Sequence, residues 1–338
     1  MKSSLDNLYS REKKNSALPL FLAARAYVLN GLSTRLIFDC KDVGLFFQEG
    51  LSHSVRFWGQ YEIRASDLFI TTLPWLHDRK DFETAAEVIC QTQPLKSNAM
   101  NQFLICCNTG SEVVHARAAG FEKSFLINQN AFIDTDVFKI TESSLEKIFY
   151  LVINTRPEKW KRPFFANGIK NLAIIKGRNY RPDDYYDLSS LGPVYINENR
   201  LPPRVVAEIL NRSYVGGVFS EVEGANFSTV EYLLSGLPVI STASCGGRDV
   251  YFTPENHEIV YEPADVAVAL TKLINMLRLH KDLSKNIRES ALATSKNYLN
   301  TLFNHGNKFL CSAGIYNESF ERIYHNAFTN KMILYSPP

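Results

Sequence analysis

The sequence predicts an α/β protein of two domains, each built on a parallel sheet, and three observations indicate this. Short apolar runs rich in β-branched residues alternate with helical patterns along most of the chain. A length of 338 residues is enough for two domains of ordinary size, each with its own core. One stretch, residues 215–251, holds a complete strand, helix and strand, and its first loop follows the carboxyl end of a strand, where open α/β sheets bind ligands.

The first domain is expected to span residues 1–147. A helical pattern at 18–30 is closed by Gly31, and a β-rich apolar run follows it. The expected strands lie at 34–40, 67–72, 102–107 and 125–128, and the expected helices at 18–30, 56–65, 81–90 and from 111 to 120. His77 comes shortly after the strand at 67–72, at its carboxyl end.

The second domain is expected to span residues 148–338. The expected strands lie at 148–154, 172–175, 194–197, 215–220, 237–242 and 258–261, and the helices at 203–209, 228–235, 264–279 and 282–299. The closing segment, 317–328, is expected to be a helix that crosses back onto the first domain.

The loop after residues 215–220 has the chemistry of a diphosphate site. Asn226, Phe227, Ser228 and Thr229 open the helix, with Ser228 expected as N-cap and Gly236 as the left-handed residue that ends it. Backbone N–H groups at a helix start lack intrahelical partners and lie at the positive end of the dipole. They suit a phosphate or pyrophosphate.

Glu223 and Glu231 flank this helix start. A carboxylate accepts two hydroxyl hydrogen bonds at once and can fix a diol. Taken alone, Ser228 and Glu231 have the spacing of a capping box, which favours a structural role for Glu231. Together, the two acids and the helix start indicate a binding site for a pyrophosphate with a hydroxylated ring at each end. Such a molecule is a sugar nucleotide.

Four cations follow the strand at 148–154. They are Arg156, Lys159, Lys161 and Arg162. Positive charge at a strand's carboxyl end can neutralise a diphosphate and stabilise it as a leaving group. The alternative is a solvated surface loop, which a charge run usually is.

These residues resemble a known family. Glu223-Gly224 and Glu231, with seven residues between the acids, then GLPVIST and Gly246-Gly247, resemble the donor site of the family 4 retaining glycosyltransferases, or group 1 transferases. The resemblance implies the GT-B architecture, in which two Rossmann-like domains with parallel sheets face an interdomain cleft. The loop departs from the family pattern, because Ala225-Asn226-Phe227-Ser228 replaces the usual Phe-Gly-Leu type run.

The resemblance also implies roles. Glu223 lies near the transferred sugar, the amides of Asn226 to Ser228 hold the pyrophosphate, and Glu231 binds the ribose. The pair Gly246 and Gly247 lets backbone approach the sugar, which Arg248 could also reach. Arg156 and Lys161 have the family's spacing for the diphosphate, which leaves Lys159 and Arg162 as bystanders. The remaining candidates are Asn197 near the base and His77 near the sugar.

The N-terminal domain also shows the resemblance. Its run INQNAFIDTDVF resembles the Asn-rich turn that closes the family's first domain. The strand and Gly-rich turn with which family members begin are not apparent, so this domain is expected to be abridged.

The composition limits the classes of partner that the protein is expected to bind. With 45% hydrophobic and 21% charged residues and a net charge of +2, the chain is expected to be soluble and too weakly basic for nucleic acid, though weak contact with an anionic membrane surface is allowed. Six scattered cysteines lack metal-ligand spacing and favour a reducing compartment. No apolar run approaches the length of a membrane span, and the polar N-terminus has no signal-peptide core. A cytoplasmic enzyme, free or peripheral on the inner face of the membrane, is therefore expected.

The predicted function is transfer of a sugar, with retained configuration, from a UDP- or GDP-sugar to a glycan, lipid-linked or small-molecule acceptor in cell-surface glycan or glycolipid synthesis. Neither a metal nor a further cofactor is expected. Two alternatives remain: a non-catalytic nucleotide-sugar-binding or scaffold protein of the same fold, and a GT-B enzyme that modifies nucleic acid. No Gly-x-Gly-x-x-Gly follows a strand, which disfavours a dinucleotide oxidoreductase.

Overall fold

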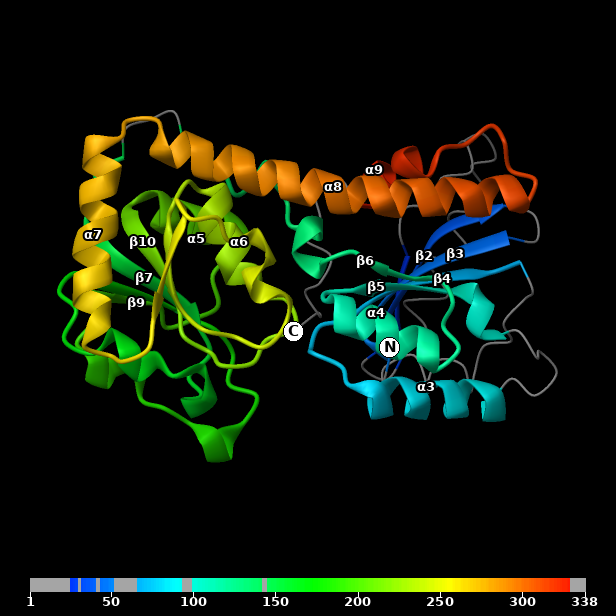
Figure 1. Cartoon of the computed structure of the whole chain (residues 1–338), viewed down its shortest axis with the longest axis horizontal. Coiled ribbons are helices and arrows are strands. Elements are labelled where there is room, and N and C mark those ends of the chain that lie inside the picture. The colour runs from blue at the N-terminus through cyan, green and yellow to red at the C-terminus, as the bar shows by residue number, and fades with distance from the viewer. Residues whose placement is uncertain are drawn as a thin grey trace, which may run out of the picture.

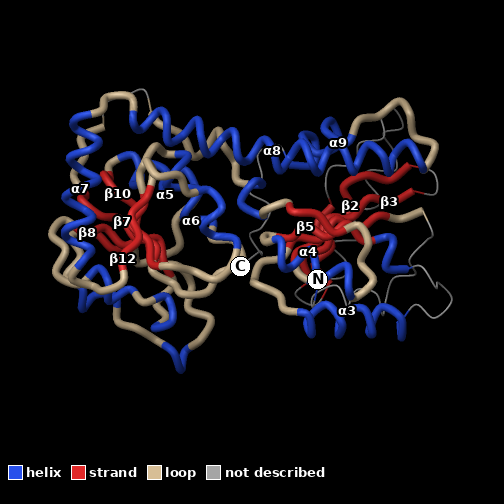
Figure 2. The backbone as a smooth tube through the Cα atoms, in the orientation of Figure 1, coloured by secondary structure: helices blue, strands red, loops and turns tan. Residues whose placement is uncertain are grey.

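The computed structural model describes residues 25–29, 32–40, 43–51, 66–92, 99–141 and 145–328. In this part of the chain two six-stranded sheets lie next to one another, each with helices packed on it (Figure 1). Figure 2 shows the strands gathered into two separate groups. The predicted fold class, α/β with two Rossmann-like domains, is confirmed.

The second sheet is parallel throughout, with the order β12-β11-β10-β7-β8-β9. Its strands are β7 (Phe149–Thr155), β8 (Leu172–Lys176), β9 (Tyr195–Ile196), β10 (Ser213–Val218), β11 (Val239–Thr242) and β12 (His257–Val260). Counted from β7 this is the dinucleotide-fold order 3-2-1-4-5-6, so the strand order reverses between β7 and β10. That reversal is where ligands bind in sheets of this kind.

Three helices pack on the second sheet. They are α5 (Pro203–Asn211), α6 (Phe227–Leu234) and α7 (Asp265–Leu279). The buried Tyr232 ring of α6 lies against Gly216 of β10, where a Cβ would come within 2.3 Å of it. The Tyr232 hydroxyl accepts a hydrogen bond from the Asn154 amide (2.5 Å). Glycine at 216 therefore lets α6 pack tightly over β7 and β10 and fixes the height of its first turn.

The first sheet is mixed, so the prediction that its strands are all parallel was wrong. Its strands are β1 (Arg25–Leu29), β2 (Leu32–Cys40), β3 (Val43–Glu49), β4 (Leu68–Thr72), β5 (Phe103–Cys107) and β6 (Ser124–Leu126). The strands β1, β2 and β3 pair antiparallel, whereas β3 to β6 pair parallel. Residues 25–29, expected as helix, form β1 because β2 offers a hydrogen-bonded partner that local pattern cannot reveal. Strand β3 was not predicted, and the helix expected at 56–65 lies outside the described residues.

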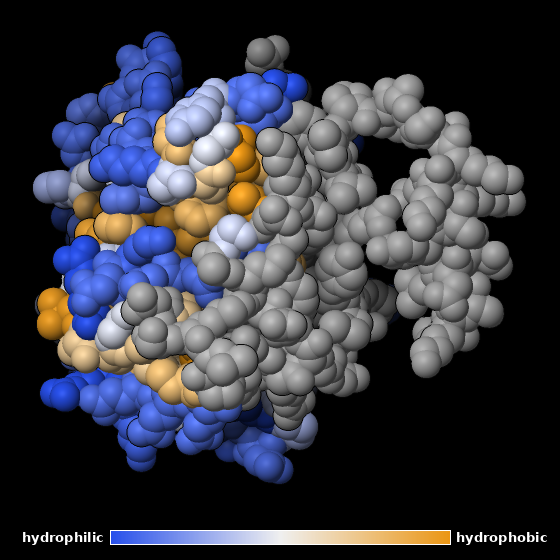
Figure 3. All heavy atoms as spheres, turned by 90° about the vertical axis from the view of Figure 1, so that its right-hand side faces the viewer, coloured by the Kyte–Doolittle hydropathy of each residue, from blue (hydrophilic) through white to orange (hydrophobic). Residues whose placement is uncertain are grey.

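Both faces of the first sheet are covered. The helices α3 (Arg79–Thr92) and α4 (Gly110–Ala118) pack on the face that holds Phe69 and Phe103. The opposite face, with Leu45 and Ile70, meets α8 (Leu283–Ser312) and α9 (Phe320–Phe328). Figure 3 views this end of the molecule, where apolar residues form a band in the middle of the described surface with hydrophilic residues above and below.

The helix α8 joins the two domains. Ile287 and Ala291 near its start belong to the core of the second domain, and Leu302 and Leu310 near its end belong to that of the first. Figure 1 shows it running along the top of both sheets. The crossing element is therefore α8 and not the segment 317–328, most of which is α9 and packs beside the end of α8. We propose the domain boundary near Lys147, between β6 and β7.

Candidate functional site

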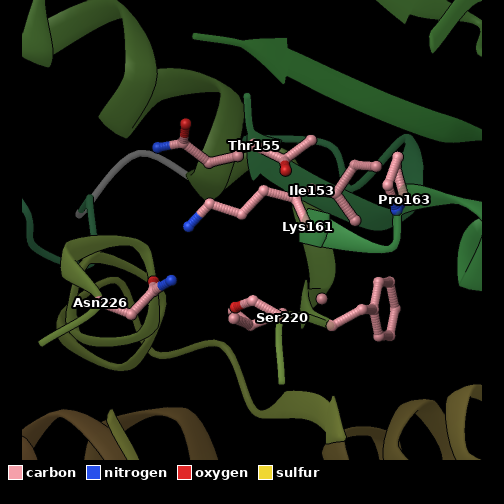
Figure 4. Close-up of a pocket in the computed structure, with 10 residues that line it drawn as sticks. Ile153, Thr155, Lys161, Pro163, Ser220 and Asn226 are labelled. Atoms are coloured by element: carbon pink, nitrogen blue, oxygen red, sulfur yellow. The ribbon is translucent and has the colours of Figure 1, made fainter. Parts of the chain in front are cut away.

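A pocket opens at the reversal of the strand order. It lies beyond the carboxyl ends of β7 and β10, encloses about 280 Å³ including space open to solvent, and is lined by Ile153, Asn154, Thr155, Lys161, Pro163, Gly217, Val218, Phe219, Ser220 and Asn226. In Figure 4, Lys161 extends across the pocket and Asn226 borders it below. The elements that form it are two parallel strands, the cationic loop after β7 and the start of α6.

The start of α6 is capped two residues earlier than predicted. Asn226, and not Ser228, is the N-cap, because its Oδ1 accepts a hydrogen bond from the Thr229 amide (3.1 Å). The Ser228 hydroxyl instead donates to the Asn154 carbonyl (3.1 Å), so the Ser228–Glu231 capping box is not formed. The amides of Phe227 and Ser228 are the first of the helix and have no intrahelical acceptor. Among the described residues neither amide has a hydrogen-bond acceptor, so both are free donors beside the pocket.

Lys161, which lines the pocket, forms an ion pair with Glu223. The Glu223 carboxylate is buried, and its Oε1 accepts hydrogen bonds from the Ser220 hydroxyl (2.6 Å), the Asn226 amide nitrogen (3.0 Å) and the Lys161 ammonium. Burial lowers the pKa of Lys161, while the Glu223 charge opposes that shift. The predicted cation and the first predicted acid are thus brought together beside the helix start.

Glu231 lies one turn into α6 and faces β7. It is only 3% exposed, and its Oε2 accepts a hydrogen bond from Asn154 Nδ2 (2.9 Å). Burial raises the pKa of Glu231 to about 7, against the effect of this bond. A carboxylate with such a pKa and one committed oxygen retains hydrogen-bonding capacity for a ligand.

Arg156 lies farther from the pocket, among aromatic rings. Its guanidinium carbon is 4.9 Å from the ring centroid of Trp75, 5.4 Å from that of Trp160 and 5.3 Å from that of Tyr180. Its side chain is 20% exposed and approaches one acid, Glu158, at 3.6 Å. Its charge reaches Lys161, whose pKa it lowers slightly.

Two other cations of the same loop are placed differently. Lys159 is exposed. Arg162 adopts a left-handed backbone (φ 49°) and donates to the Phe219 carbonyl (2.6 Å) and the Thr242 hydroxyl (2.8 Å). It ties the loop to the ends of β10 and β11, which is a structural role.

The structure does not support a sugar contact by Arg248, and it engages the Asn197 side chain in holding the backbone. Arg248 is fully buried and donates to the Ser220 carbonyl (2.7 Å), the Thr242 carbonyl and Asp249 Oδ1 (2.7 Å). Asn197 bonds both ways to the backbone of Lys176 (2.6 and 3.0 Å). Both side chains use their hydrogen-bonding groups to hold loop ends together. This corrects the prediction for Arg248, whereas the expected contact of the base with the backbone near Asn197 stays a prediction.

Gly246 and Gly247 allow close contact between backbone segments. A Cβ at Gly246, whose φ is +131°, would lie 1.7 Å from the Glu223 carbonyl oxygen, and one at Gly247 would lie 2.6 Å from the Asn108 side chain. The Gly247 carbonyl also accepts a hydrogen bond from Asn128 Nδ2 (2.8 Å). These glycines therefore bring the loop after β11 against both the Glu223 loop and the first domain.

In the first domain, His77 is held by its neighbours. Its Nδ1 is 2.8 Å from the Trp75 carbonyl, and since a carbonyl only accepts, Nδ1 carries a hydrogen and donates it to this oxygen. Its backbone amide donates to Glu112 Oε1 (3.0 Å). Glu112 and Trp75 were not singled out from the sequence. The Thr109-x-x-Glu112 spacing of a capping box could have identified Glu112, whereas Trp75 carries no local signal.

Neither a protein-family model nor a curated protein matches this sequence. Among solved structures the chain is similar to HepE of Anabaena in complex with UDP, at 13% identity over 78% of this chain and 82% of HepE, with a TM-score of 0.50. It is also similar to TarM of S. aureus, at 14% identity over 77% of this chain and 54% of TarM, with a TM-score of 0.54. Sucrose-phosphate synthase of Thermosynechococcus elongatus matches at 16% identity over 77% and 73% of the two chains, with a TM-score of 0.54.

In the described ranges, each helix is either too short or too polar to cross a lipid bilayer. At these identities the structural comparisons concern the fold, and together with the two sheets they show that the chain has the two-domain α/β fold of the GT-B type.

Proposed function

We propose that the chain is a retaining glycosyltransferase that moves a sugar from a UDP- or GDP-sugar to a hydroxylated acceptor, without a metal. The observation that carries the proposal is the meeting of Lys161 and Glu223 beside the unpaired start of α6, at the reversal of a parallel sheet. HepE, of similar fold, was solved with UDP and with UDP-glucose, which supports a nucleotide-sugar ligand.

Each residue has a role in this proposal. The amides of Phe227 and Ser228, with Lys161 and Arg156, hold the diphosphate. Glu223 accepts hydrogen bonds from hydroxyls of the transferred sugar, and Glu231 from the ribose. His77, from the first domain, lies near the transferred sugar.

The reaction needs no strong protein base. The bond between the anomeric carbon and the phosphate oxygen breaks, and the nucleoside diphosphate leaves with that electron pair. The acceptor oxygen bonds to the same face of the anomeric carbon and passes its proton to the departing phosphate oxygen. Cations and amides at the diphosphate stabilise the charge that develops there.

Single-turnover release of nucleoside diphosphate tests the proposal. The protein is mixed with a panel of UDP- and GDP-sugars in the presence of a chelator, with and without simple glycan acceptors, and the anomeric configuration of any product is read by NMR. We expect release with at least one donor and retained configuration. Binding of a donor without release of nucleoside diphosphate would favour a scaffold protein. Failure of all the donors to bind would refute the proposal.

The chain offers a matched pair of variants for this assay. Lys161→Ala removes the buried cation of the pocket and should abolish release, whereas Lys159→Ala removes an exposed lysine two residues away and should leave it unchanged. Equal loss in both variants would show that the loop acts only through its general charge. Arg156→Ala gives a second, independent loss at the proposed diphosphate site.

A further inference from the structure

Trp75 reaches from the first domain into the cationic loop of the second. It follows β4, and its ring is 6.0 Å from that of Trp160 and 4.9 Å from the guanidinium carbon of Arg156. The backbone of Trp75 also abuts Gly224, since a Cβ there would lie 2.5 Å from the Trp75 carbonyl carbon. One residue of the first domain therefore touches both the cation and the acidic loop of the proposed donor site.

Arg156 is mostly buried, yet its hydrogen-bonding groups are unused. Within the described ranges its guanidinium donates no hydrogen bond, and its nearest acid, Glu158, lies at 3.6 Å. Glu158 is already committed, because Oε2 accepts from Trp160 Nε1 (2.6 Å) and Oε1 from the Tyr180 amide (2.9 Å). A guanidinium stacks on aromatic rings through its face, whereas it binds carboxylates and phosphates through its N–H edge.

The stem of Arg156 is confined as well. A Cβ at Gly177 would lie 3.2 Å from Arg156 Cγ, so the side chain passes directly over that glycine. The rings of Trp160 and Tyr180 belong to the same domain as Arg156, and Trp75 alone of the three comes from the other domain. The position of the Arg156 guanidinium therefore depends in part on whether the first domain lies against the second.

We infer that Trp75 is a positioning residue for the donor diphosphate: it holds the Arg156 guanidinium by its face and leaves the N–H edge free for phosphate oxygens. The inference rests on the proposed function, and it adds that the first domain completes the donor site of the second. Diphosphate binding and the approach of the domains are then coupled, because the same contact serves both.

Affinity for UDP, GDP and uridine, measured by calorimetry, tests this inference. Since a cation–π contact contributes roughly 0.5–2 kcal/mol, Trp75→Ala should weaken diphosphate binding by about 2- to 30-fold. Uridine, which has no phosphate, should bind both proteins equally. Trp75→Phe retains a ring face and should restore most of the affinity.

A double-mutant cycle separates positioning from general packing. In an Arg156→Ala background, Trp75→Ala should cost little further affinity, because the group it positions is gone. Tyr316→Ala removes another exposed aromatic residue, 79% exposed and distant from the pocket, and should change nothing.

Three results would overturn the inference. They are unchanged UDP and GDP affinity in Trp75→Ala, an equal loss for uridine, or an equal loss in the Arg156→Ala background. If the unaltered protein bound neither nucleotide, the proposed function would fail and this inference with it, whereas binding that ignores Trp75 leaves the proposed function standing.

Discussion

The spacing Ser/Thr-x-x-Glu occurs in both domains, each time near the start of a helix that follows a parallel strand, and the two acids have different fates. In the first domain Glu112 forms a complete capping box with Thr109. Its carboxylate accepts from the amides of His77 (3.0 Å), Asn108 (2.7 Å) and Thr109 (3.1 Å). In the second domain Ser228 and Glu231 form no such box, and Glu231 accepts only from Asn154 among the residues described.

The difference separates a structural acid from an acid with spare capacity. Glu112 is fully used in joining the ends of β4 and β5, and its pKa is raised by burial against the effect of its amide partners. Glu223 and Glu231, near the start of α6 in the other domain, are bonded to side chains, Lys161 and Asn154 among them. A ligand can replace side-chain partners far more readily than backbone ones. The comparison therefore supports the proposal that the second domain's acids bind the ligand.

The largest effect is expected at Lys161. Lys161→Ala leaves Glu223 buried without its cation, and breaking such a pair costs about 3–5 kcal/mol of unfolding free energy. Urea unfolding measures this. The double variant K161M/E223Q removes both charges and should recover most of the stability while UDP affinity stays lost. A single variant as stable as the parent would show that Glu223 does not depend on its cation.

The next effect is expected at Glu112. Glu112→Ala leaves the three amides without their acceptor and should lower the unfolding free energy by about 3 kcal/mol, since bonds to a charged group are the stronger ones. Glu112→Gln keeps one acceptor oxygen and should lose less. UDP affinity of the folded variants should not change. A loss of affinity comparable to that of a Glu231 variant would end the distinction between the two acids.

The site could be predicted from the sequence where its elements are contiguous. β10, the loop with Glu223, α6 and β11 follow one another within residues 213–242, so strand pattern and loop chemistry located the pocket. The cationic loop after β7 was placed at the same edge for a different reason, since the carboxyl ends of parallel strands in one sheet lie at one edge.

Long-range partners explain what the sequence could not reveal. Arg248 is taken out of the ligand site by the carbonyls of Ser220 and Thr242, which lie at the ends of two different strands. Arg156 meets Trp75 across 81 positions of sequence. At the N-terminus, the pattern of residues 25–29 suits a helix or a strand, and pairing with β2 decides for the strand.

The smallest expected effect is the pH dependence of the unfolding free energy that the titration of Glu231 produces. Because burial raises the pKa of Glu231 from 4.5 to about 7, the folded state holds a proton there that the unfolded state releases. Its contribution to stability is greatest below pH 4.5 and is lost as the pH rises to about 7. Between pH 5 and 7 the loss should be about 2 kcal/mol.

Glu231→Gln removes this titration. Its unfolding free energy should therefore exceed that of the parent at pH 8 and approach it at pH 5, as measured by urea unfolding across that range. Its nucleoside-diphosphate affinity should nevertheless fall, because an amide accepts fewer hydroxyl hydrogen bonds than a carboxylate. Higher stability with lower affinity in one variant is the combination expected of an acid kept for a ligand. A Gln variant that is less stable at every pH, with unchanged affinity, would place Glu231 with Glu112 as a structural residue.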